Sequence, residues 1–203
     1  WSDERTEAAG SISARGGANG GNGGFVEVSG KDRLSFSSFV DTRAPRGRVG
    51  TLLLDPSGVC LYDSDNSGCA GYGAEFAWST LNLTTTDVTI YTSGAGDDIK
   101  VSEGYSWSSL YGLRLLAHDD IDTNAQTLNN SGGGSFLLVA GWNGNSVAPG
   151  TTGTTGNITG LGHFTTNGGA FTALAAGDVT LGNITTSATN NDGSNAGDIA
   201  VTG

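Results

Sequence analysis

Short alternations of apolar and polar residues recur along most of the chain. The apolar side chains are two residues apart, which is the period of a strand with one buried face. Gly, Asn and Asp separate these stretches and supply the backbone conformations that tight turns require. We expect the following residues to point into a core and to stack in rows: Leu52, Leu54, Val88, Ile90, Ile99, Val101, Val179, Leu181, Ile199 and Val201.

The pattern returns at intervals, most clearly toward the C-terminal end. Residues 176–181 read AGDVTL, and residues 196–201 read AGDIAV. Similarly, GGSF at 133–136 returns as GGAF at 168–171. Loose repeats of about 20 residues are typical of a solenoid, in which similar coils stack and pair their backbones. The sequence therefore predicts an all-β solenoid over residues 1–203, and a β-sandwich is the alternative.

Two stretches interrupt the repeat, at about 55–78 and 142–157. The first contains Pro56 and both cysteines, and the second is rich in Gly, Asn and Thr. We predict that both protrude from the solenoid as loops, where recognition residues are usually found.

Composition and charge exclude several classes of protein. The 203 residues carry 20 acidic and 9 basic side chains, a net charge of −11, and include 35 glycines but no methionine. A basic nucleic-acid binder is excluded, so we predict no nucleic-acid partner. The chain has no apolar run of about 18 residues that would span a membrane as a helix. Because it lacks an initiating Met and a leader, we expect it to be processed or cut from a longer chain.

The N-terminal quarter carries a more specific pattern. It reads GSISARGG at 10–17, GGNGGFVEVSGK at 20–31, VDTRAP at 40–45 and GTLLLDP at 50–56. This block closely resembles a segment of the filamentous-haemagglutinin-like exoproteins of Gram-negative bacteria, which are secreted by the two-partner route. The resemblance implies a right-handed parallel β-helix, either complete or a segment of a longer one. It also implies export through an outer-membrane transporter, a secreted or cell-surface location, and no catalytic residue or cofactor.

Three functions follow as hypotheses. The first is a non-enzymatic, adhesin-like structural protein whose partners are a host or neighbour-cell glycan or protein, or further copies stacked end to end into fibres. The second is a polysaccharide lyase or hydrolase on a β-helix, in which Asp119 or Asp120 acts with Arg114. Adjacent acids near turns more often cap and solvate the chain, and the fold alone does not decide. The third is the stalk of a toxin-delivery exoprotein.

The interrupted stretch around residue 60 holds the candidate chemistry of the loops. Cys60 and Cys69 are predicted to form a disulfide, the default for two cysteines in a secreted protein. Asp63 and Asp65 occupy the first and third positions of a calcium-loop pattern with Gly68 at the sixth, but the twelfth position lacks the bidentate Glu. An ordinary Asx-rich turn is therefore the alternative to calcium. Zinc is disfavoured by the ligand spacing, and the chain has only two histidines.

Two further residue groups are candidates for recognition. Aromatic side chains could form a carbohydrate platform, although core stacking is the commoner role of such residues. Asn-X-Ser/Thr motifs are candidate glycosylation sites, although many arise by chance in a chain rich in Asn and Thr. The aromatic residues are Trp78, Tyr105, Trp107, Tyr111 and Trp142, and the motifs begin at Asn82, Asn129, Asn157 and Asn183.

Overall fold

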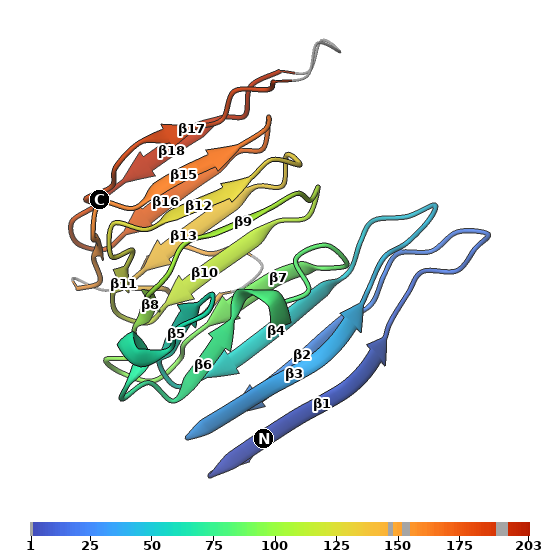
Figure 1. The fold of residues 1–203 in the computed structure, drawn as a ribbon, viewed down its shortest axis with the longest axis horizontal. Coiled ribbons are helices and arrows are strands. Elements are labelled where there is room, and N and C mark those ends of the chain that lie inside the picture. Colours follow the sequence, from blue (N-terminus) through green and yellow to red (C-terminus); the bar gives the residue numbers. More distant parts are fainter. Residues whose placement is uncertain (1, 146–147, 152–154, 190–194) are drawn as a thin grey trace.

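The computed structural model describes residues 2–145, 148–151, 155–189 and 195–203. Strands make up most of its regular structure, and every sheet is parallel, which confirms the all-β prediction. The strands lie in stacked layers from the N-terminal to the C-terminal end (Figure 1). The described strands therefore do not form the antiparallel sheets of the β-sandwich alternative. Within the described residues, no helix is long and apolar enough to cross a membrane.

The largest sheet has seven strands, and chain order runs steadily across it. Each strand pairs in parallel with the strand one coil before and one coil after it. In order these strands are β2 (Phe25–Gly30), β4 (Thr51–Pro56), β7 (Asp87–Tyr91), β10 (Leu113–Ala117), β13 (Phe136–Ala140), β16 (Phe171–Ala175) and β18 (Ile199–Thr202).

Three smaller sheets complete the structure. The five-stranded sheet contains β6 (Ala74–Ala77), β5 (Val59–Tyr62), β8 (Ile99–Val101), β11 (Ile121–Asp122) and β14 (Ile158–Thr159). The four-stranded sheet contains β9 (Tyr105–Trp107), β12 (Thr127–Asn130), β15 (His163–Thr166) and β17 (Ile184–Thr185). The two-stranded sheet consists of β1 (Arg5–Ser13) and β3 (Arg33–Asp41). The structure also contains two short 3₁₀ helices, η1 (Ser67–Cys69) and η2 (Trp78–Thr80).

From β7 to β15 the chain visits the three larger sheets in rotation. β10, β11 and β12 form one such coil, and β13, β14 and β15 form the next. The register places Ile121 between Ile99 and Ile158, so equivalent positions of successive coils lie side by side. This connectivity is consistent with a β-solenoid, because each coil pairs its backbone with its neighbours.

The core is a set of apolar rows that run across the coils. In the seven-stranded sheet, Val88, Leu113, Phe136 and Phe171 form one such row, and all four are buried. Of the ten predicted core residues, six are fully buried as expected: Leu52, Leu54, Val88, Ile90, Ile99 and Val101.

The prediction is less accurate at the C-terminal end of the rows. Val179 and Leu181 are only partly buried against the core. Ile199 and Val201 take their predicted places in the rows, beside Phe171 and Ala173, but they are 51% and 47% exposed, so only their predicted burial is wrong. Both lie on β18, which is the edge of its sheet and pairs only with β16 among the described strands.

The predicted loop at 55–78 is shorter in the structure. β5 and β6 lie within this range and pair in parallel with each other, so the excursion between strands is residues 63–73. In the stretch 142–157, the described part contains an isolated bridge from Trp142 to Thr151. Trp142 packs on the outer side of the seven-stranded sheet against Leu116 and Val139.

Candidate functional site

Of the two acids proposed for catalysis, Asp120 uses its side chain to connect coils, whereas Asp119 donates its backbone N–H to the Asp97 carbonyl. The backbone N–H of Asp120 donates to Asp98 Oδ1 at 2.9 Å, and the N–H of Asn157 donates to Asp120 Oδ1 at 2.6 Å. Asn157 Oδ1 in turn accepts from the N–H of Asp178 at 2.9 Å. Because each side chain receives the backbone of the next coil, we call these four residues the carboxylate–amide ladder. These hydrogen bonds give the ladder residues a structural role, so their presence does not require a catalytic one.

Arg114 does not join these acids. It lies near the start of β10, whereas Asp119 and Asp120 follow the end of that strand, so most of its length separates them. The nearest charge acting on Arg114 is Asp87, which raises the pKa of the guanidinium, while burial lowers it more strongly. The structure thus does not assemble the acid–base group that the enzyme hypothesis requires.

The two cysteines are bonded as the sequence predicts. The Cys60–Cys69 disulfide closes residues 60–69, and both side chains are fully buried. Cys60 lies on β5 and Cys69 ends η1, so the bond ties the excursion at 63–73 to the sheet. Lys100 on β8 adds a hydrogen bond to the carbonyl of Gly68 at 2.9 Å. The disulfide is therefore a clamp on this loop.

The calcium candidates Asp63 and Asp65 are arranged as a turn. The backbone N–H groups of Asp63, Ser64 and Asp65 converge on one Glu103 oxygen at 2.7, 2.6 and 3.0 Å, and these bonds lower the pKa of Glu103. The Asp65 carboxylate accepts from the Ser67 N–H and hydroxyl. Across the described residues, no group of three or more His, Cys, Asp or Glu side chains could hold a metal ion.

The aromatic candidates mostly lie inside the coils. Trp78 is 1% exposed and stacks on Tyr105 and Trp107, with ring centroids 5.9 and 6.4 Å apart. Trp107 continues this contact to Phe136. Trp142 is also buried, against Tyr91. These residues form core contacts, which favours stacking over a carbohydrate platform.

The four glycosylation candidates differ in accessibility. Asn183 is exposed, whereas Asn129 lies on β12 and is half-buried. The side-chain amide of Asn82 donates to two backbone carbonyls, and that of Asn157 donates to Asp120. A glycan bonded to the amide nitrogen would replace these bonds, so the structure favours Asn183.

The histidines also have ordinary structural positions. His118 is exposed after β10. His163 on β15 accepts the backbone N–H of Asn183 through Nδ1 at 2.8 Å, which links it to the next coil. Neither histidine forms part of a catalytic arrangement in the described residues.

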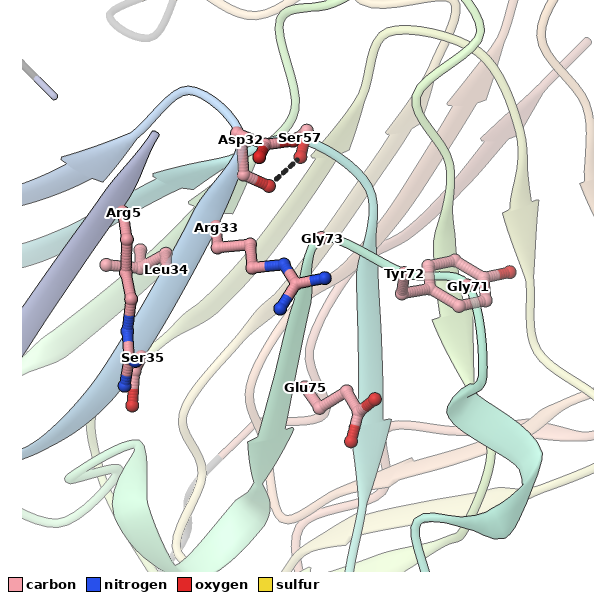
Figure 2. A pocket seen from close by; sticks show the side chains of 10 residues that line it. All are labelled: Arg5, Asp32, Arg33, Leu34, Ser35, Ser57, Gly71, Tyr72, Gly73 and Glu75. Atoms are coloured by element: carbon pink, nitrogen blue, oxygen red, sulfur yellow. Dashed lines mark hydrogen bonds between the residues drawn. The ribbon is translucent and has the colours of Figure 1, made fainter. Parts of the chain in front are cut away.

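A polar hollow of about 660 Å³ opens between β3 and β6. It lies where the two-stranded sheet meets the edge of the five-stranded sheet, joined there by a bond from the Leu34 N–H to the Gly73 carbonyl at 3.4 Å. Figure 2 shows Arg33 extending from β3 toward β6, with Tyr72 and Glu75 beyond it and Arg5 on the other side. This hollow is the candidate functional site.

The charges around the hollow are unequally paired. Arg5 and Arg33 are direct partners in the β1–β3 register, and the Arg5 guanidinium binds Glu7 at 3.0 Å. Glu75 accepts from the Asn66 amide at 2.8 Å. Within the described residues, no carboxylate lies at ion-pair distance from Arg33. Arg33 therefore presents an uncompensated positive charge.

The rim of the hollow combines a ring with hydroxyl groups. Burial and the nearby Asp98 raise the pKa of Tyr72, so its phenol is neutral near pH 7 and can donate a hydrogen bond. Ser57 lies at the upper rim in Figure 2 and donates to the carbonyl of Asp32 at 2.9 Å. Tyr72 also lines an adjoining hollow of about 310 Å³ that includes Asp97 and Asp98.

Sequence reasoning does not find this site. Arg5 and Arg33 are 28 residues apart and meet only because β1 and β3 pair while the intervening β2 joins another sheet. The one available signal is the concentration of basic residues before residue 48, in an otherwise acidic chain.

Comparison of the chain with models of known protein families, with curated proteins and with solved structures gives no match. The functional argument therefore depends on the geometry and chemistry described above.

Proposed function

We propose that this chain is part of a right-handed parallel β-helix in a non-enzymatic, adhesin-like exoprotein, where it serves as a rigid scaffold and a binding surface. The carboxylate–amide ladder carries the proposal: Asp120, one of the two acids that would suggest catalysis, accepts a backbone N–H group between coils, as do Asp98 and Asn157. Rigid stacked coils that leave a polar hollow at their surface suit binding better than turnover.

The disulfide supports an oxidising location. Such bonds persist in secreted and surface proteins and are rare in the cytosol, and here Cys60–Cys69 is fully buried. Secretion from a Gram-negative bacterium through a two-partner transporter is part of the proposal and is supported by the sequence resemblance.

A polysaccharide assay tests the non-enzymatic role. We expect no loss of chain length when the protein is incubated with acidic and neutral polysaccharides, measured by size-exclusion chromatography. Depolymerisation that disappears in Asp119→Ala or Asp120→Ala, but not in Asp178→Ala as a control, would overturn the proposal. Immunogold labelling of intact cells tests the location, and label confined to the cytoplasm would contradict it.

End-to-end association into fibres is a second proposal. It is supported by the parallel stacking of the coils, because the backbone pairing that joins one coil to the next can also join one copy to another. Denaturing electrophoresis of native material separates the cases. A band near 20.4 kDa from fibrous material supports a polymer of small subunits, whereas a band several times larger shows one long chain.

A further inference from the structure

We propose that the hollow between β3 and β6 binds an acidic saccharide, through a sugar carboxylate held by Arg33 and a sugar ring held beside Tyr72. The inference depends on the proposed role as a binding surface, and it specifies the chemical class of the ligand.

The uncompensated positive charge of Arg33 favours an acidic ligand. Like charges in register on neighbouring strands destabilise a sheet, yet Arg5 and Arg33 are direct partners. The neighbouring cations are already paired, since Arg5 binds Glu7 and Lys31 binds Asp3. A carboxylate from a ligand would relieve the repulsion and form a planar, bidentate pair with the free guanidinium.

The other lining groups suit a polyhydroxylated ring. Figure 2 places Tyr72 and Glu75 on the β6 side of Arg33 and Ser57 at the upper rim. The Glu75 carboxylate can accept from sugar hydroxyls, and the Ser57 hydroxyl, which already donates to the Asp32 carbonyl, can accept from another. The ring of Tyr72 offers an apolar face with a polar end. Carboxylate, hydroxyls and ring face are thus all matched in one place.

The volume of the hollow and the charges around it limit the classes of ligand that it can bind. A volume of about 660 Å³ falls in the range of small-ligand sites, about 300–1,000 Å³, and has room for a short oligosaccharide. Nucleic acids and polyphosphates are disfavoured, because Glu75 lies in the hollow and the chain carries a net charge of −11. A sugar with one carboxylate per ring keeps its charges a full ring apart, so one carboxylate can meet Arg33, whereas a polyphosphate places adjacent charges beside Glu75.

Calorimetric titration with tetragalacturonate tests the proposal, using the folded chain at low salt. The matched probe is the same tetramer with its carboxylates methyl-esterified, which retains the rings and removes the charge. We expect saturable binding of the acid form and at least a tenfold weaker dissociation constant for the ester. Arg33→Gln should weaken binding of the acid form at least tenfold.

Arg46→Gln is the control variant. It removes the same charge from an exposed position outside the hollow, so we expect a change in the dissociation constant of less than twofold. Equal weakening by both variants would show only a diffuse attraction, and no saturable binding would show no site. Either outcome overturns the inference.

The test also separates this inference from the proposed function. Absent binding, with intact polysaccharide and surface labelling, overturns the inference alone. Shortened tetramer in the recovered titration mixture overturns the non-enzymatic role, even if binding depends on Arg33.

Discussion

The two halves of the five-stranded sheet are built in different ways. From β8 to β14, Ile99, Ile121 and Ile158 lie in register, and the carboxylate–amide ladder connects the turns beside them. From β6 to β5, the same sheet has a disulfide, a clamped loop and an adjacent hollow. Where the coils repeat, the polar groups of each coil form hydrogen bonds with the neighbouring coils. Where the repeat is interrupted, a hollow and the unpaired charge of Arg33 remain.

The two halves also differ in how their polar side chains are used. In the regular half, polar side chains near the turns accept backbone N–H groups from the next coil. In the irregular half, β3 and β6 meet without a continuous ladder, so Arg33 and Glu75 remain exposed. Four substitutions test whether the repeated coils provide most of the stability and whether the disulfide keeps the loop at 63–73 ordered.

The largest expected effect is in the stacked core of the regular half. Phe136 is 2% exposed and contacts the rings of Trp107, Phe164 and Phe171. Phe136→Ala should lower the free energy of unfolding by about 3–5 kcal/mol, because it leaves a cavity among these rings. Urea denaturation measures the change. A loss below about 1 kcal/mol would show that this stack is not the source of stability.

The disulfide comes next. Replacing Cys60 and Cys69 together by Ser should lower the free energy of unfolding by about 2.5–3 kcal/mol, because the unfolded chain loses a short closed loop. Limited proteolysis of the folded variant should cut within 63–73 before any site in β10 or β13. Equal cutting throughout would contradict a local clamp, and the intact protein without reductant is the control.

The ladder should have a smaller effect. Asp120→Ala removes the acceptor of the Asn157 N–H and amide groups, so we expect a loss of about 2 kcal/mol in urea denaturation. Asp120→Asn keeps an acceptor oxygen and should recover most of that loss. If both variants are equally destabilised, the carboxylate charge matters and the shared acceptor does not.

The smallest effect concerns a buried acid beside the irregular half. Asp55 on β4 is 3% exposed, and burial raises its pKa to about 6. Because the folded state holds this proton more tightly than the unfolded chain, stability falls as the pH rises from about 4 to about 6 and stays lower above. Asp55→Asn should therefore stabilise the protein by about 1 kcal/mol at pH 7.5.

A measurement of the melting temperature at two pH values checks this prediction. The gain from Asp55→Asn should be clear at pH 7.5 and absent near pH 3.5. A gain of the same size at both values would assign the effect to packing and not to the buried charge.

The sequence predicts the regular rows because their signal is local. Residues such as Val88 and Ile90 alternate with less apolar neighbours, so the sequence of each strand indicates which of its faces is buried. The same alternation at Ile199 and Val201 carries no information on whether a neighbouring strand covers it. The β5 segment Val59–Tyr62 lacks alternation because three of its four residues are buried and Cys60 on the outer face is among them. The sequence therefore predicts a loop here.

The candidate site is harder to predict because it depends on which sheets the early strands join. β2 enters the seven-stranded sheet, while β1 and β3 pair with each other. Only that arrangement brings Arg5 beside Arg33 and opens the hollow next to β6. No spacing within a single stretch encodes it.

The disulfide also has a mechanical consequence. When a protein of stacked coils is pulled from its ends, coils that contact only their neighbours can unfold one at a time. The bond between Cys60 and Cys69 spans nine positions, so about 30 Å of contour length stays unavailable to the applied force. The first coils would thus extend less than the later ones under the same load, and the hollow lies in that less extensible part.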